Sequence, residues 1–439
     1  MYPNLYYVFK DWFGVEWPAL SLLNTFGLMV AIAFVGAAYT LHLELKRKEM
    51  QGFLQPREES VMVGEGASWY ELLMNFILGF LFGYKILGAL LDKEPSVSFQ
   101  SYLFSGEGSL IGGMLIGSLM AFMRWREKKK TQLPKPEKRI LRIWPHDRVG
   151  DIVVLAMVFG ILGAKLFDNL ENFDAFMEDP IGHLFSASGL TFYGGLIVAA
   201  LAICIYAYRK GISLAHLTDA AAPGLMLAYA LGRIGCQVSG DGDWGVYNKS
   251  FTCDEYGHVM PANPDDFQKR ITKDSTYFLE GKVPDGSGNY QYVTDRTYSS
   301  LQVVPAITWK ADWLPDWFFA SCYAQNVNKD GVPIPGITDE HNRRLPQPVI
   351  PTPMYETILC LFFFGLMWVL RKSIRQPWMM FGFYLILNGL ERYFMEKVRV
   401  NDLYDIAGMQ FSQASLIAML LVVFGLAIIL FNRKSAAVS

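Results

Sequence analysis

The sequence predicts an all-α integral membrane protein, a polytopic helical bundle with about nine spans. Hydrophobic residues make up 52% of the chain and charged residues only 18%. Apolar runs of about 20 residues recur, the length that crosses about 30 Å of hydrocarbon. Lys and Arg concentrate in the loops on one side of these runs. The lipid bilayer is therefore the first expected partner, and a net charge of -2 argues against a nucleic-acid partner.

The expected spans have ends uncertain by about four residues. They cover residues 19–41, 72–91, 109–123, 150–167, 190–208, 216–237, 354–370, 378–395 and 412–431. The bias of Lys and Arg places the N-terminus outside and the C-terminus in the cytoplasm. The first residues carry no positive region ahead of an apolar stretch, so we expect no cleavable signal peptide.

An internal repeat indicates a duplicated pair of spans. Gly83-Tyr-Lys85 and the later Gly112-Gly113 recur about 80 positions on as Gly163-Ala-Lys165 and Gly194-Gly195. Chance similarity between glycine-rich spans is the alternative, since glycine is common in membrane helices. The matched order in both members of the pair favours duplication. A copied hairpin adds two crossings, so all later loops keep their side.

A polar stretch without long apolar runs separates the sixth and seventh spans. It is large enough for a small core, and the alternation near Tyr290 predicts some strand. Cys253 and Cys322 could pair outside the cell or could both be reduced and buried. The expected organisation is an N-terminal segment with the first span (1–71), an inserted duplicate hairpin (72–126), core spans (140–245), an extracytoplasmic insertion (246–350) and three C-terminal spans (351–439).

Charged residues stand at the outer ends of several apolar helices. Residues 231–245 put Arg233, Asp241 and Asp243 into a glycine-rich turn that ends at Gly245. An unpaired Arg in hydrocarbon costs several kcal/mol, about 3 by the lowest estimates, so Arg233 needs a partner, a water-filled cavity or an anionic ligand. Two arginines from different helices would suit a phosphate, which Arg binds through paired hydrogen bonds.

The topology brings further polar residues to the same face. These are Tyr193, Gly194 and Gly195 opening span five, Tyr355 and Glu356 opening span seven, and Glu391, Arg392, Glu396 and Arg399 closing span eight. Each has a simpler interpretation: glycine pairs pack helices, the charges of span eight anchor it at the interface, and Asp241 and Asp243 form turns. Their joint placement favours a site.

Several ordered blocks resemble the signature of the prolipoprotein diacylglyceryl transferase family. Gly232-Arg233-Ile234-Gly235 with the turn ending Trp244-Gly245 resembles its central block, and Asp219-Ala-Ala-Ala-Pro223 resembles the approach to it. Residues 188–197, 351–356, 392–402 and 409–414 resemble its His-Gly-Gly, Tyr-Glu, Arg-x-x-x-Glu and Gly-Gln blocks. The resemblance covers roughly half the chain.

The resemblance implies a reaction and its residues. The family moves the diacylglyceryl group of phosphatidylglycerol onto the lipobox cysteine thiol of a prolipoprotein, whose signal peptide is the second substrate, in the bacterial inner membrane. Arg233, Arg392, Glu356 and Tyr193 are the implied catalytic residues. The implied substrate-binding residues are Gly194, Gly195, Asp241, Asp243, Gly245, Tyr355, Glu396 and Arg399. No cofactor and no metal is expected.

The sequence departs from the family pattern at several positions. Tyr193 replaces a His, and a phenol is a poorer base than imidazole at neutral pH. Other departures are Cys236, Ser239, Ile350, Pro353 and Asn401. Tyr193 and Cys236 also resemble recurrent family variants, which favours activity. Two alternatives remain: an inactive relative whose exterior domain binds an envelope partner, and a transporter suggested by the repeat, although transporter sites usually lie at the midplane.

Overall fold

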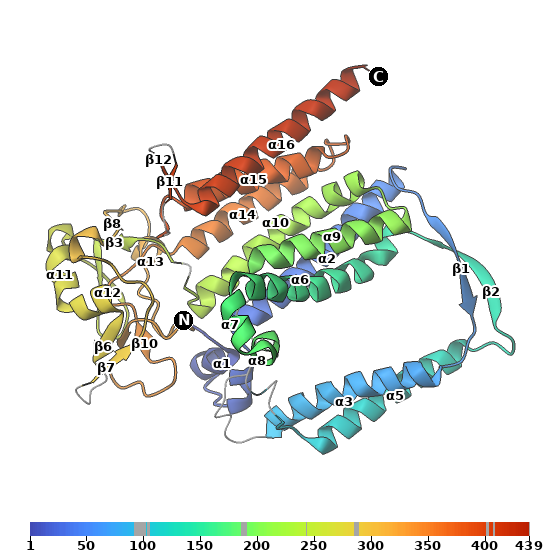
Figure 1. The fold of residues 1–439 in the computed structure, drawn as a ribbon, viewed down its shortest axis with the longest axis horizontal. Helices are drawn as coiled ribbons and strands as arrows, with labels where there is room; N and C mark the ends of the chain where they lie inside the picture. Colours follow the sequence, from blue (N-terminus) through green and yellow to red (C-terminus); the bar gives the residue numbers. More distant parts are fainter. Residues whose placement is uncertain are drawn as a thin grey trace. The chain divides into compact units, whose positions relative to one another are not determined.

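The computed structural model describes residues 1–91, 102, 106–185, 191–242, 244–284, 289–400, 404–406 and 409–438. Helices dominate, and six of the described helices are long and apolar enough to cross a membrane. The long helices are α2 (Thr25–Met50), α3 (Trp69–Leu91), α5 (Leu110–Thr131), α6 (Val149–Glu171), α9 (Phe192–Lys210), α10 (Leu214–Ser239), α14 (Thr352–Leu370), α15 (Met379–Met395) and α16 (Gln413–Val438). The prediction of a polytopic all-α membrane protein is confirmed (Figure 1), and the count of about nine spans stays a prediction.

The first span begins six residues later than predicted. Residues 18–22 form a short 3₁₀ helix, and α2 starts only at Thr25. The reason is a local cap, because the Asn24 side chain accepts hydrogen bonds from the backbone N–H groups of Phe26 (2.8 Å) and Gly27 (3.3 Å). The hydrophobic run before Asn24 therefore does not continue the helix.

The chain divides into two compact units. One comprises residues 1–8, 24–37 and 218–439, and the other comprises residues 9–23 and 38–217. Helices α2 and α10 contribute residues to both. In the first unit, α10, α14 and α15 share a buried core of small and flexible side chains: Ala222, Met226, Ala230, Cys360, Met367, Met380 and Leu387.

The insertion in the first unit has its own core of aromatic and aliphatic side chains. Its elements are short: β3 (Tyr247–Asn248), β4 (Phe251–Cys253), β5 (Val259–Pro261), α11 (Phe267–Lys273), α12 (Ser275–Glu280), β6 (Lys282–Pro284), β7 (Tyr290–Tyr292), β8 (Ala306–Ile307), α13 (Asp316–Phe319), β9 (Val332–Pro333) and β10 (Arg343–Arg344). Strand β7 lies where the sequence predicted strand, antiparallel to β6. Cys253 and Cys322 form a disulfide. The insertion thus folds around a core and one covalent link.

The second unit contains two helical hairpins, α3–α5 and α6–α9, with the same internal register. A Cβ added at Gly83 would lie 2.4 Å from the Gly112 carbonyl oxygen, and one added at Gly163 would lie 2.5 Å from that of Gly194. The Ser109 N–H donates to Tyr84 and the Thr191 N–H to Ala164, positions that also correspond in the repeat. These matched contacts support the predicted duplication.

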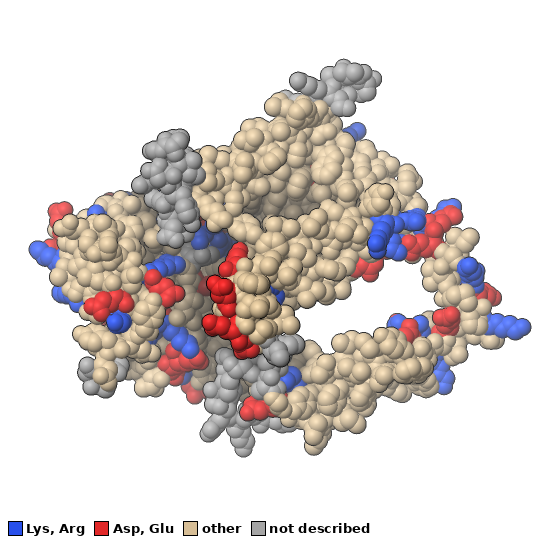
Figure 2. All heavy atoms as spheres, in the orientation of Figure 1, with Lys and Arg blue, Asp and Glu red and all other residues tan. Residues whose placement is uncertain are grey.

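Elements that the sequence analysis did not predict complete the chain. Strands β1 (Arg57–Val63) and β2 (Glu137–Ile143) form an antiparallel ribbon flanking α3–α5. Three short helices, α1 (Leu5–Phe13), α7 (Phe173–Glu178) and α8 (Pro180–Phe185), and a hairpin of β11 (Tyr404–Ile406) and β12 (Met409–Phe411) are the others. Figure 2 shows Lys, Arg, Asp and Glu gathered on the insertion and around the ribbon, with few on α3, α9 and α16.

Candidate functional site

The glycine-rich turn after α10 is joined by backbone hydrogen bonds to two other segments. The Gly245 N–H donates to the Ile350 carbonyl (2.8 Å), just before α14, and the Val246 N–H donates to the Val398 carbonyl (2.9 Å), just after α15. A Cβ at Gly245 would lie 2.6 Å from the Val398 oxygen, so this close approach requires glycine. The turn therefore fixes the ends of α10, α14 and α15 against one another.

Six ionisable side chains meet at this junction and form what we call the arginine cluster: Arg233, Glu356, Glu391, Arg392, Glu396 and Arg399. Glu356 is its centre. The Arg233 Nε atom pairs with Glu356 Oε2, while Arg399 Nη1 and Arg392 Nη1 lie 3.4 Å and 3.8 Å from Glu356 Oε1. Arg392 Nε also lies 3.9 Å from Glu396 Oε2, one helical turn on. The structure thus brings Arg233 and Arg392 together.

Exposure differs sharply within the arginine cluster. The Glu356 side chain is 1% exposed and that of Arg233 is 11% exposed, whereas that of Arg392 is 25% exposed. A guanidinium that is partly open to the surroundings can exchange a distant carboxylate contact for an incoming anion. Arg392 is therefore the member best placed to meet a ligand first.

Glu391 is a buried carboxyl group of the arginine cluster that the sequence analysis did not assign a role. Its side chain is 1% exposed, and neither oxygen has a hydrogen bond of normal geometry among the described residues. Glu356, Arg392, Arg233 and Tyr229 are its electrostatic neighbours. Ionising a buried carboxyl group that lacks hydrogen bonds is costly, so we propose that Glu391 is a neutral acid although two guanidinium groups lie nearby.

Tyr355 lies next to Glu356 in sequence but faces the insertion. Its hydroxyl donates to the Phe318 carbonyl (2.5 Å), and its ring packs against Phe318 and Trp309. In the turn, the Asp241 N–H donates to the Cys236 carbonyl, closing α10. Asp243 lies outside the described residues, as does Asp402. Structural contacts thus account for the positions of Tyr355 and Asp241, and their predicted roles with substrate stay predictions.

Tyr193, Gly194 and Gly195 open α9 in the second unit. A Cβ at Gly194 would lie 2.3 Å from Phe167 Cβ, and one at Gly195 would lie 2.8 Å from the Gly160 carbonyl oxygen. Both glycines therefore permit close packing of α9 on α6. Tyr193 is exposed at the start of the helix. Their predicted roles with substrate stay predictions.

The chain matches the family model for prolipoprotein diacylglyceryl transferase over residues 109–431, well over half of its length. The chain belongs to this family.

Individual relatives are moderately similar. A phosphatidylglycerol--prolipoprotein diacylglyceryl transferase from Dehalococcoides mccartyi is 29% identical over 154 residues, 33% of this chain and 55% of the relative. One from Leptospira interrogans is 30% identical over 244 residues, 55% of this chain and 53% of the relative. One from Streptococcus pneumoniae is 26% identical over 312 residues, 70% of this chain and 85% of the relative. The chain therefore spans about half the length of the first relatives it matches and most of the third.

Membership of the diacylglyceryl transferase family explains why three separate sequence blocks meet. The block from Arg233 to Gly245 and the blocks around Glu356 and Arg392 are separated in the chain, and all of them contribute to the arginine cluster or its backbone frame. Two neighbours were missed as site residues: Cys236, whose Sγ lies 3.7 Å from Arg233 Nη1, and Tyr229, whose ring lies 5.7 Å from the Arg233 guanidinium. Their spacing of three and four residues from Arg233 on α10 could have indicated them.

Proposed function

We propose that the chain transfers the diacylglyceryl group of phosphatidylglycerol to the thiol of a lipobox cysteine in a prolipoprotein. The observation that carries this proposal is the convergence of Arg233 and Arg392 on Glu356 at the end of three helices. Family membership and the printed names of the relatives support the same reaction. In this reaction a sulfur–carbon bond forms, the glycerol carbon–oxygen bond to phosphate breaks, and the bonding electron pair leaves on that phosphate oxygen. The thiol proton is taken up by a base or by the released glycerol phosphate.

The arginine cluster supplies what the departing phosphate needs. Negative charge builds on the phosphate as the carbon–oxygen bond breaks, and fixed guanidinium groups stabilise that charge without reorganising. A guanidinium binds phosphate oxygens through two parallel N–H donors. Glu356 holds Arg233, Arg392 and Arg399 in place before the lipid arrives. We assign phosphate binding to Arg233 and Arg392, and the orientation of Arg392 to Glu396.

We place the protein in the bacterial inner membrane with its N-terminus and insertion on the periplasmic side. The Cys253–Cys322 disulfide supports this orientation, because disulfides persist in oxidising compartments. Helix α5 ends in Lys128, Lys129 and Lys130, and α9 ends in Arg209 and Lys210, as expected for cytoplasmic ends. The arginine cluster would then face the outer leaflet of the inner membrane.

Complementation tests the function in the cell. We would deplete the native transferase of a bacterium that needs it and express this chain, following precursor lipidation by gel mobility. Restored lipidation by the wild type and by Arg375→Lys, an exposed arginine between α14 and α15, is the expected result. Arg233→Lys keeps a positive charge beside Glu356, so it should express normally, and it should restore little lipidation because Lys lacks the planar pair of donors. Folded, inserted wild type that fails to restore lipidation contradicts the proposal and favours an inactive relative that binds an envelope partner.

A further inference from the structure

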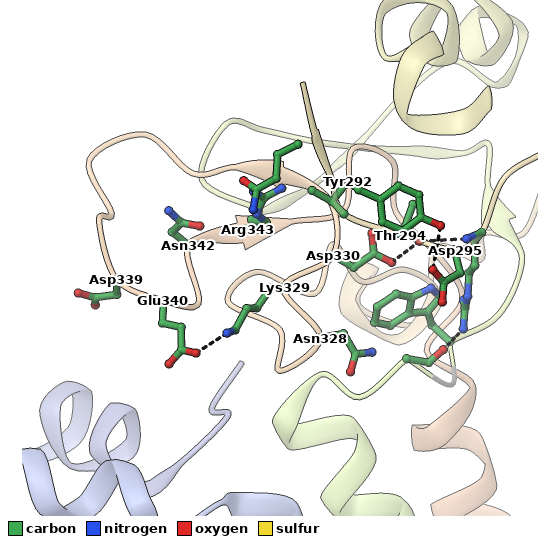
Figure 3. A pocket seen from close by; sticks show the side chains of 15 residues that line it. Tyr292, Thr294, Asp295, Asn328, Lys329, Asp330, Asp339, Glu340, Asn342 and Arg343 are labelled. Carbon is green, nitrogen blue, oxygen red and sulfur yellow. Dashed lines mark hydrogen bonds and ion pairs between the residues drawn. The ribbon is translucent and has the colours of Figure 1, made fainter. Parts of the chain in front are cut away.

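The insertion encloses a polar cavity beside the glycine-rich turn. The cavity has a volume of about 730 Å³ and a wall formed by residues 291–296. Residues 328–330, 339, 340, 342 and 343 line another part of it, as Figure 3 shows. This volume lies within the range of about 300–1,000 Å³ that is usual for ligand sites. It can hold a short stretch of polypeptide.

Two amides in the cavity are free to bind a ligand. The side chains of Asn328 and Asn342 make no hydrogen bond to another described residue, and Figure 3 shows both of them beside the cavity. An amide side chain offers two donors and an acceptor, the same groups that a peptide bond requires from a partner. The other lining charges are of both signs, so the cavity favours a polar chain without strong net charge.

The walls of the cavity are held rigidly. Asp330 accepts hydrogen bonds from Tyr277 (2.7 Å) and Thr294 (3.1 Å), and Arg343 donates to Gln291 (2.6 Å). The Arg296 guanidinium stacks 5.0 Å from the Trp244 ring centroid and bonds the Gly242 carbonyl. A preformed site loses less entropy when it binds a flexible partner. The cavity is therefore formed before any ligand binds.

The cavity is adjacent to the arginine cluster along the backbone. Gly242 and Trp244 line it, while the next residue, Gly245, is bridged to Arg399, whose guanidinium contacts Glu356. A polypeptide with its cysteine at the cluster must continue into water on the side where the insertion stands. At about 3.3 Å per extended residue, a few residues reach past the turn.

We propose that this cavity binds the polypeptide segment that follows the acceptor cysteine, a polar and extended chain. The inference rests on the proposed transfer reaction and adds to it a second contact with the acceptor protein, separate from the lipobox. Asn328 and Asn342 hydrogen-bond the backbone of that segment. The contact raises the residence time of acceptors whose chain continues as an extended segment after the cysteine.

Two acceptor peptides of different length test this role. Both carry the same lipobox; one ends two residues after the cysteine and the other continues for ten further polar residues. The full-length protein in phosphatidylglycerol vesicles should show a kcat/KM about tenfold higher for the long peptide, chiefly through KM, a gain that matches about 1.4 kcal/mol of extra contact. The double variant Asn328→Ala/Asn342→Ala should bring the ratio of the two kcat/KM values towards one. Gln268→Ala, an exposed amide of α11 outside the cavity, should keep the wild-type ratio.

Direct binding separates this inference from the transfer reaction. The ten-residue segment alone, without a cysteine, should bind the wild type and Gln268→Ala, with binding weakened about tenfold in the double variant. Equal kcat/KM for both peptides with the wild type, or a segment that binds the double variant as well as the wild type, overturns the inference. A wild type that binds the segment but transfers to neither peptide overturns the proposed function instead.

Discussion

Glu356 is the residue on which the arginine cluster depends. Its 1% exposed carboxylate contacts three guanidinium groups from α10, α15 and the segment after α15. Removing one partner of a buried ion pair leaves uncompensated charge, which costs about 3–5 kcal/mol. Because the Glu356 carboxylate is buried from bulk water, we propose that its first role is to hold the arginines in place.

Substitution of Glu356 tests this role. Glu356→Gln should lower the thermal unfolding temperature in detergent and abolish most transfer, because three arginines lose their shared carboxylate. Glu391→Gln should leave the unfolding temperature unchanged or raise it, since the amide is isosteric with a neutral acid and cannot ionise. An equal loss of stability in both variants contradicts the assignment of Glu391 as a neutral acid.

Asp330 gives the insertion a pH dependence. Burial raises the pKa of Asp330 above its ordinary value of 3.8, although hydrogen bonds from Tyr277 and Thr294 lower it in part. The folded acid then holds its proton more tightly than the unfolded one. This contribution to stability is complete below pH 3.8 and is lost as pH rises through the folded pKa. Asp330→Asn should reduce the pH dependence of the insertion's stability above pH 3.8.

Limited proteolysis at a series of temperatures, repeated at each pH, measures how the stability of the insertion depends on pH. The wild-type insertion should become easier to cleave as pH rises from about 4 towards neutrality. The Asn variant should show a smaller change over the same range. A steeper dependence in the variant would show that another group controls this range.

At the scale of elements, the hairpins are held by glycine contacts. Gly163→Ala places a methyl group 2.5 Å from the Gly194 carbonyl oxygen, a contact that forces α6 and α9 apart. Gly160→Ala on the same helix meets nothing within 4 Å. We expect about 1–3 kcal/mol of destabilisation for the first change and little for the second, measured by thermal unfolding in detergent. Equal unfolding temperatures would show that the helices tolerate separation.

Helix positions were predictable because a membrane imposes length and apolarity on each span. Strands β1 and β2 were not, since their residues alternate poorly and their pairing joins segments 80 residues apart. The start of α2 was missed because a single side-chain cap at Asn24 outweighed a continuing hydrophobic run. Local pattern thus located the spans, and specific hydrogen bonds set their ends.

Within the site, the sequence singled out charged residues that the structure brings together, but it did not predict how they pair. Arg233, Arg392 and Glu356 were named from their positions at span ends. The convergence of the two arginines on Glu356 depends on tertiary packing, which the sequence does not show. Glu391 has no spacing signal that distinguishes it from an interfacial anchor. The cavity of the insertion depends on contacts between segments far apart in the chain, such as Arg343 with Gln291.

At the scale of the whole molecule, we predict that the α3–α5 hairpin is an addition to a seven-span body. Its flanking strands are antiparallel, with Val63 opposite Glu137, so the chain enters and leaves the hairpin at one place. Deletion of residues 72–123 should therefore leave the sidedness of every later loop unchanged. Labelling of single cysteines placed in those loops measures this, and a reversed loop would contradict the duplication.

The release of glycerol phosphate from labelled phosphatidylglycerol in the presence of a lipobox peptide tests the proposed reaction directly. Wild type and Arg375→Lys should each release one glycerol phosphate for every peptide that is lipidated. Arg233→Lys and Arg392→Lys should fold normally yet lose most of the release, because Lys lacks the planar pair of donors that holds a phosphate. Near-wild-type turnover in both Lys variants would contradict the account.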